Sequence, residues 1–201
     1  MALVLGMRMS TFRWWIALSA LSLGAVLIFP QNGSARVVAM SIKSSKPGPQ
    51  ILELRGGAQI QAELPPGYRL GVLALPQRNT YMFMGPDNKN GEHAVMTVDI
   101  LPSTAKLSSA KAVFDGVFKA YSAGCGDFKS AMSKSIQVKG ITFEKANFEG
   151  TMDGIRSKGF AIVTRLTQGF CVMVARDRET DFKQSEATMT GIVNSCQFKT
   201  K

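Results

Sequence analysis

The sequence predicts an α+β fold in which a largely antiparallel β-sheet is covered by two main helices. Short apolar segments follow one another with only a few turn residues between them, and such spacing requires hairpin connections. Two longer segments, near 110–121 and 178–195, carry apolar residues at helical spacing. Because both helices must bury their apolar faces on the sheet, we expect an α/β/α-type sandwich and not a dinucleotide-binding βαβ fold.

The first half of the domain reads as strands followed by a helix. Residues 68–75 and 80–86 have the composition of two short strands, and 91–102 alternates until Pro102 ends it. The apolar face of that third strand consists of Ala94, Met96, Val98 and Ile100. The period then changes, and one helical stripe collects Ala110, Phe114, Val117, Phe118 and Tyr121. Gly124 and Gly126 end this helix.

The second half begins with a connector marked by spaced lysines at 129, 134 and 139, followed by a strand at 141–150. A turn at 152–154 leads into the strongest strand pair of the chain, 157–177, which closes at 167–169. A second helical stripe comprises Phe182, Ser185, Met189, Ile192, Val193 and Cys196. The predicted order is therefore strands, helix, three strands, helix and a last short strand at 197–200.

The N-terminus has the layout of a secretory signal. Arg8 and Arg13 form a basic region, residues 14–29 carry no charge, and Pro30 ends the apolar run before the small residues 33–35. We expect cleavage after Ala35; an uncleaved membrane anchor is the alternative, although the run is short for a span. Translation starting at Met7 or Met9 would give a more ordinary signal. The predicted organisation is a signal peptide at 1–35, a tether with a short strand at 36–64 and one α+β domain at 65–201.

The positive charge limits the classes of partner. The net charge is +10, and it falls to +8 once a cleaved signal removes Arg8 and Arg13. A basic exported chain can associate weakly with an anionic membrane surface or cell-wall polymer, whereas an ordinary solvated surface is the simpler interpretation. Nucleic acid is not expected, because no basic and aromatic motif of a known reader is present.

Few residues could carry catalysis or bind a metal. The single histidine, His93, lies at the start of a strand without the partners that a zinc site requires, so we interpret it as a surface residue. Residues 85–92 resemble a calcium loop only superficially, because Lys89 occupies a ligand position and Gly91 comes one residue early. Asp177 is the expected N-cap of the second helix. The sequence therefore predicts no catalytic residue, no metal site and no cofactor.

The three cysteines are the remaining residues that could form a covalent bond or act as nucleophiles. The strand from Phe170 and the following helix each extend roughly 26 Å, so a helix folding straight back would bring Cys196 close to Cys171. A structural Cys171–Cys196 disulfide is the favoured interpretation, with Cys125 as a free thiol, because an exported chain meets oxidising conditions. The alternatives are three buried, unbridged cysteines and, more remotely, a nucleophilic Cys171.

Four segments together resemble the PsbP/Mog1-like superfamily, which includes small exported bacterial proteins. They are LPPGYRL at 64–70, FMGPDNKNGEHAVMTVDIL at 83–101, GTMDGIRSKGFAIVTRLTQGFCVMVARD at 150–177 and IVNSCQF at 192–198. The chain departs from lipid-anchored members in lacking a lipobox cysteine. The resemblance covers about two thirds of the chain, contributes no active-site residues and implies an accessory role.

The expected function is therefore that of an exported, non-enzymatic binding or assembly module that acts on a protein partner in the cell envelope. Two alternatives stay open: a small hydrolase-like enzyme that uses Asp, Ser or Lys, and a protein held at the envelope surface by its charge.

Overall fold

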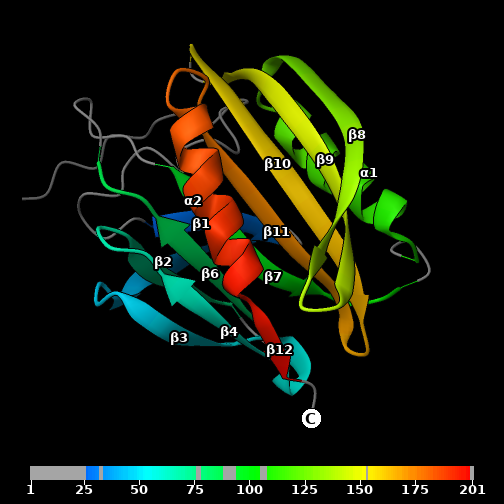
Figure 1. Ribbon diagram of the computed structural model, residues 1–201. Coiled ribbons are helices and arrows are strands. Elements are labelled where there is room, and N and C mark those ends of the chain that lie inside the picture. Colours follow the sequence, from blue (N-terminus) through cyan, green and yellow to red (C-terminus); the bar gives the residue numbers. More distant parts are fainter. Residues whose placement is uncertain are drawn as a thin grey trace, which may run out of the picture.

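The computed structural model describes residues 26–31, 34–75, 78–87, 94–104, 108–152 and 154–199, with the backbone alone at 26–39, 55, 74, 75 and 78 (Figure 1). The basic region and most of the apolar run of the predicted signal lie outside the described residues, as does His93. The described part contains one nine-stranded sheet, one three-stranded sheet and two α-helices.

Every pairing between described strands is antiparallel, as the hairpin spacing predicts. The strand order of the large sheet is β1-β2-β5-β6-β7-β11-β10-β9-β8. In that order the strands are β1 (Val26–Gln31), β2 (Ser34–Ser44), β5 (Arg69–Leu75), β6 (Arg78–Met84), β7 (Val95–Leu101), β11 (Gly169–Arg178), β10 (Ile155–Leu166), β9 (Ile141–Met152) and β8 (Gly126–Val138).

Helix α1 (Ala110–Ser122) packs on one face of the large sheet. It begins at a favourable cap, because the Ser109 hydroxyl accepts a hydrogen bond from the Ala112 amide at 3.2 Å. Phe114 is fully buried against Ala161 and Val163 of β10, and the whole predicted stripe belongs to this cluster. The periodicity of 110–121 therefore predicted both the helix and its buried face.

Helix α2 (Phe182–Ser195) packs on the opposite face, on the near side of the sheet in Figure 1. Successive β10 residues point to opposite faces, so Phe160 and Ile162 contact the α2 cluster while Ala161 and Val163 contact the α1 cluster. A three-stranded sheet of order β12-β4-β3 shares the α2 side. Its strands are β3 (Gly48–Glu53), β4 (Gln59–Leu64) and β12 (Gln197–Lys199), with a short 3-10 turn η1 (Arg55–Gly57) between β3 and β4.

The interval 36–64, predicted to be a tether with a short strand, contains more strand than expected, because it forms most of β2 and all of β3 and β4. Leu52, Ile60 and Leu64 are fully buried in the core that α2 covers. The lysine, serine and proline residues in this interval are typical of a linker. The alternation of Ile60, Ala62 and Leu64, in contrast, is the pattern of a half-buried strand.

The predicted connector around Lys129 and Lys134 is also a strand. β8 pairs with β9 through a two-residue turn at Lys139 and Gly140, whose φ values are +51° and +85°. Two consecutive positive φ values match the primed turn that suits the twist of a hairpin. The chain therefore has four strands between its helices, not three.

Candidate binding groove

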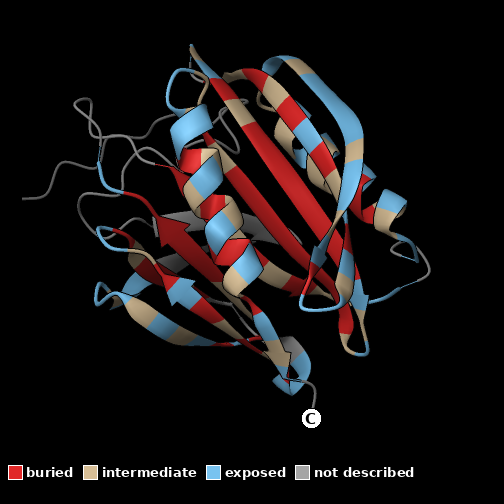
Figure 2. Cartoon of the chain, viewed as in Figure 1, coloured by how far each residue is buried: buried red, intermediate tan, exposed pale blue. Residues whose placement is uncertain are grey.

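A groove of about 370 Å³ lies on the α2 side of the large sheet, beside α2. Helix α2 packs mainly against β10, β11 and β4, so the part of this face formed by β8 and β9 is only partly covered. Figure 2 shows the result: β10 and β11 are largely buried, whereas β8 is largely exposed. The residues that line the groove are Lys129, Ser130, Ala131, Asn147, Phe148, Glu149, Lys158, Gly159, Phe182 and Glu186.

The strand register explains why these residues meet. Lys129 pairs with Glu149, and Ala131 pairs with Asn147, so two rows of side chains cross from β8 to β9. Phe182 and Glu186 lie one helical turn apart on α2 and form the opposite wall. The groove thus combines apolar surface from Phe182 and Ala131 with charged and amide groups.

An ion pair joins the sheet to the helical wall. Lys145 Nζ lies 3.3 Å from Glu186 Oε1, and the same ammonium group lies 4.6 Å from the centre of the Phe160 ring. The Lys145 side chain is only 17 % exposed, which favours this pair over a fully solvated one. Lys145 therefore fixes the distance between β9 and α2 at the groove.

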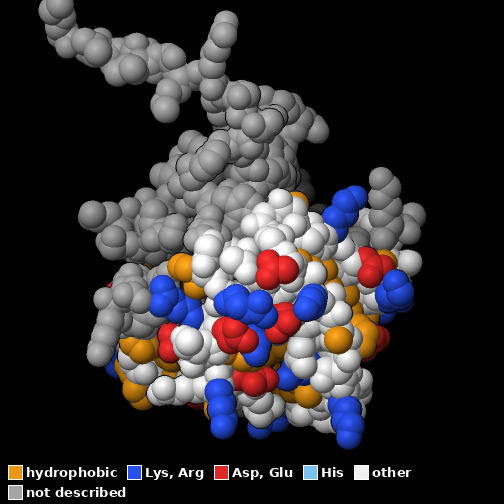
Figure 3. Space-filling model, turned by 90° about the horizontal axis from the view of Figure 1, so that it is seen from above, with side chains coloured by type: hydrophobic (Ala, Val, Ile, Leu, Met, Phe, Trp, Pro, Cys, Tyr) orange, Lys and Arg blue, Asp and Glu red, His pale blue; other side chains and the backbone are white. Residues whose placement is uncertain are grey.

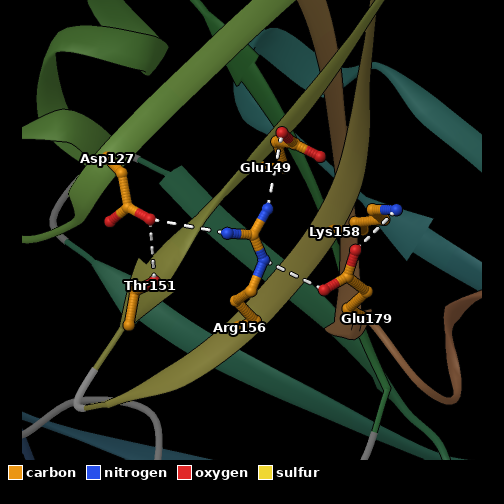
Figure 4. A network of polar contacts seen from close by, with 6 residues as sticks. All are labelled: Asp127, Glu149, Thr151, Arg156, Lys158 and Glu179. Atoms are coloured by element: carbon orange, nitrogen blue, oxygen red, sulfur yellow. Dashed lines mark hydrogen bonds and ion pairs between the residues drawn. The ribbon is translucent and has the colours of Figure 1, made fainter.

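A network of charges borders the groove at the start of β10 (Figure 4). The Arg156 guanidinium group lies between three carboxylates. Its Nε is 3.0 Å from Glu179, its Nη1 is 3.6 Å from Asp127, and its Nη2 is 3.6 Å from Glu149. Glu179 also pairs with Lys158 at 2.8 Å. Since β8, β9 and β10 contribute together with Glu179, which directly follows β11, the network joins these strands at one end of the sheet.

The ion pair between Lys158 and Glu179 shifts the pKa of each group in the direction that favours its charged form. The hydrogen bond from Lys158 lowers the pKa of Glu179, and the hydrogen bond to Glu179 raises the pKa of Lys158. Both groups therefore stay charged at neutral pH. Figure 3 views this end of the molecule and shows Lys and Arg side chains interleaved with Asp and Glu side chains. The surface is polar and nearly balanced in charge here, so it does not form a strong anion-binding patch.

A second group of polar side chains lies deeper, between β11 and α2. Burial raises the pKa of the Asp177 carboxyl, and a hydrogen bond with Ser185 opposes the rise. Burial also raises the pKa of Tyr68, the charge of Asp177 raises it further, and a hydrogen bond with Thr188 opposes the rise. These residues do not line the groove, and their hydrogen bonds connect the sheet to α2, so we assign them a structural role.

The predicted N-cap was wrong by one turn. Helix α2 starts at Phe182 with Asp181 as its N-cap residue, and Asp177 is instead the penultimate residue of β11. Its Oδ1 accepts the backbone N–H of Arg178 at 2.7 Å. The strand continues to Arg178 because its residues pair with β10, and this pairing outweighs the local preference of Asp177 for a helix start.

The structure places Cys171 and Cys196 in one core cluster, both fully buried and both as free thiols. Burial raises the pKa of Cys171 well above its ordinary value, and the nearby Cys196 thiol raises it further. Burial raises the pKa of Cys196 to about 12, and its Sγ donates a hydrogen bond to the Ile192 carbonyl at 3.4 Å. Cys125 is partly exposed, after α1. The two thiols share the core that the predicted bridge needs, but the bridge itself stays a prediction.

The other predicted features leave little chemistry in the described part of the chain. Of the loop at 85–92, Asp87 is described, and it pairs with Arg69 at 2.9 Å. Across the described ranges, no group of three or more His, Cys, Asp or Glu side chains lies close enough together to hold a metal ion. Neither described helix combines the length and apolar character needed to cross a membrane.

The groove could not be predicted from the sequence. Lys129 falls in the predicted connector, and no local pattern marks Asn147, Glu149 and Glu186, because the groove depends on strand register and on the position of α2. The one available signal was the Lys139-Gly140 dipeptide, which could have identified the hairpin that brings β8 beside β9.

No protein-family model matches this sequence, and no curated protein matches it either. Among solved structures, the chain is similar to PA94, a protein of unknown function from Pseudomonas aeruginosa, with a TM-score of 0.52 and 10 % identity over 77 % of this chain and 99 % of that one. It is also similar to LpqN of Mycobacterium tuberculosis, described as involved in cell envelope biogenesis, with a TM-score of 0.44 and 13 % identity over 76 % and 92 % of the two chains. At 10 % identity the likeness to PA94 concerns the fold alone, and membership of the PsbP/Mog1-like superfamily stays a prediction.

Proposed function

We propose that this protein is a non-enzymatic binding module that holds a segment of a protein partner in the groove between α2 and strands β8 and β9. The observation that carries the proposal is the groove itself: an open channel of about 370 Å³ with apolar surface at Phe182 and Ala131 and polar groups at Asn147 and Lys129. Backbone and side chains of a peptide need such a mixture of apolar contact and hydrogen-bonding groups.

The rigidity of the walls supports this role. The floor belongs to paired strands, and Lys145 joins it to Glu186 on the helical wall. Arg156 and its carboxylate partners bind the ends of the strands together. A preformed groove spends little binding free energy on ordering its own side chains, and this favours recognition of a flexible segment.

We place the module outside the cytoplasm, after removal of residues 1–35, as an α/β/α-type sandwich of the PsbP/Mog1-like kind. The sequence of residues 8–35 is the support for export. Cleavage after Ala35 would remove β1 together with the first two residues of β2, because all of them precede Arg36. β1 is an edge strand of the large sheet, next to β2. The intact mass of protein recovered after export tests this: a chain that begins at Arg36 supports it, and a full-length chain contradicts it.

Capture of partners by groove variants tests the proposed function. Asn147 is exposed on β9 and lines the groove, so the variant Asn147→Trp fills the channel without disturbing the core. Glu144 is exposed on the same strand but does not line the groove, so Glu144→Trp is the matched control. Each tagged protein is incubated with envelope extract, and captured proteins are quantified by mass spectrometry.

We expect at least one envelope protein that the unmodified chain and Glu144→Trp capture equally and that Asn147→Trp captures about tenfold less, because loss of a well-packed contact region costs about 1.4 kcal/mol or more. A set of captured proteins that is identical for all three chains would overturn the proposal. Circular dichroism of the variants must show the same unfolding transition, so that loss of capture reports the groove and not the fold.

A further inference from the structure

Strand β8 is one of the two edge strands of the large sheet, opposite β1, and one of its edges has no neighbour among the described strands (Figure 1). Most β8 residues are exposed, and the side chain of Met132, in the middle of the strand, is 59 % exposed. An edge strand of this kind presents backbone N–H and C=O groups that can pair with a further strand. The groove beside β8 does not account for this unpaired outer edge.

One part of β8 keeps regular strand geometry. The pairing with β9 shifts between Gly126 and Lys129 and again between Ser133 and Ile136, and between these two irregularities the run Lys129–Ser133 pairs residue by residue with Lys145–Glu149. At about 3.3 Å per residue this run extends roughly 15 Å, enough to pair with several residues of an extended chain. The irregularities limit further pairing at both ends.

Positive charge lies at both ends of the regular run, because Lys129 begins it and Lys134 directly follows it. Lys129 and Lys134 form no ion pair with any described residue. Asp127, the one acid of β8, already pairs with Arg156 and accepts a hydrogen bond from Thr151. A second copy of this chain would place lysines beside lysines along the shared edge, and like charges on neighbouring strands are unfavourable. An acidic strand would instead meet two unpaired ammonium groups.

We propose that the run Lys129–Ser133 of β8 binds an extended acidic segment of the partner by strand addition. This inference rests on the proposed function and specifies its partner. The added strand hydrogen-bonds along the outer edge of β8. Its carboxylates lie on the face of Lys129, its apolar side chains lie on the face of Met132, and Lys134 attracts the acidic segment at the end of the run. Lys129, Ser130 and Ala131 also line the groove, so the same segment continues from the edge into the channel.

Labelled peptides test the binding mode directly. The probe is a peptide of about eight residues that alternates Glu and Val, a length typical of a strand. A second peptide replaces each Glu with Lys, and a third keeps the Glu residues but carries N-methyl groups at alternate backbone nitrogens, which removes the hydrogen-bond donors of one strand edge. Fluorescence anisotropy with the full chain measures the affinity of each peptide.

We expect the acidic peptide to bind at least about tenfold more tightly than the other two, because only it supplies both the charge and the backbone donors. The double variant Lys129→Glu with Lys134→Glu should lose about tenfold in affinity, whereas Lys46→Glu with Lys199→Glu, which has the same net charge, should not. Equal binding of the acidic and the N-methylated peptides would overturn strand addition, since charge attraction alone would then account for the affinity.

Amide hydrogen exchange provides a readout that is independent of affinity. On addition of the acidic peptide, backbone amides within 129–133 should exchange about tenfold more slowly, and those of β2 should not change. Unchanged exchange across 129–133 at a saturating peptide concentration would contradict the proposal. If Asn147→Trp abolishes capture of a partner while the double lysine variant does not, strand addition fails and the groove function survives; if neither change affects capture, the groove function fails.

Discussion

At the scale of single residues, Asp177 shows how burial controls a proton. The residue is 9 % exposed, and burial raises its pKa above the ordinary value of 3.8. The folded protein therefore keeps the proton at pH values where the unfolded chain has already lost it. Because the native state binds more protons in that interval, the free energy of unfolding falls as the pH rises from about 3.8 through the raised pKa.

Replacement of Asp177 by Asn should remove this pH dependence. We expect Asp177→Asn to unfold at a higher urea concentration than the unmodified protein at pH 7, since an amide can still accept the Arg178 N–H without a buried charge. Near pH 3, where the carboxyl group is protonated in both states, the two proteins should differ little. A variant that is less stable at pH 7 would show that the carboxylate stabilises the fold.

The three cysteines differ in the exposure of their thiols and therefore in their expected reactivity. Burial raises the pKa of both Cys171 and Cys196, so neither forms a thiolate readily at pH 8, whereas Cys125 is partly exposed. In the reduced native protein, iodoacetamide should modify Cys125 first, and peptide mass spectrometry can locate the label. Rapid labelling of Cys171 would reopen its interpretation as a nucleophile.

In protein recovered after export, alkylation before reduction and unfolding counts the thiols that a Cys171–Cys196 bridge would remove.

At the scale of single elements, glycines report how closely strands and side chains pack. A Cβ atom at Gly159 of β10 would lie 2.3 Å from the Phe148 ring and 2.4 Å from the Ala175 carbonyl oxygen. Both approaches are far below van der Waals contact, so the backbone itself would have to move. Gly191 of α2 is exposed and has open space around it.

The two glycines should therefore respond in opposite ways to alanine. Gly159→Ala should lower the free energy of unfolding by about 1–3 kcal/mol through overpacking. Gly191→Ala should raise it by about 0.5–1 kcal/mol, because alanine loses less backbone entropy within a helix. Chemical denaturation measures both changes. A neutral Gly159→Ala would mean that β9 and β10 lie further apart than the structure places them.

The strength of the periodic pattern decided which elements the sequence could predict. Strands β5, β7, β10 and β11 alternate or run apolar because one or both faces are buried, and both helices have one continuous apolar stripe. β8 was missed for the opposite reason: as an edge strand it is exposed on most positions, so serine and lysine conceal its period. Within 36–64 only one short strand could be predicted, because turn-forming residues lie between the short apolar positions of this interval.

At the scale of the whole molecule, the groove depends on residues that are distant in sequence. Its lining comes from β8, β9, β10 and α2, between Lys129 and Glu186. Local patterns can predict each element, but they do not specify the register that sets Ala131 beside Asn147, nor the side of the sheet on which α2 packs. For this reason a largely antiparallel sheet with two helices could be predicted from the sequence, while the candidate site required the structure.

Site-specific photocrosslinking determines whether this groove contacts a protein partner. A small aliphatic diazirine amino acid, which leaves the channel open, replaces Asn147 in the groove or, as a control, Glu144 on the same strand, and cells producing each protein are irradiated. We predict a discrete adduct of higher mass from position 147 and none from position 144. No adduct from position 147, or the same adducts from both positions, would contradict the assignment of the groove as the binding site.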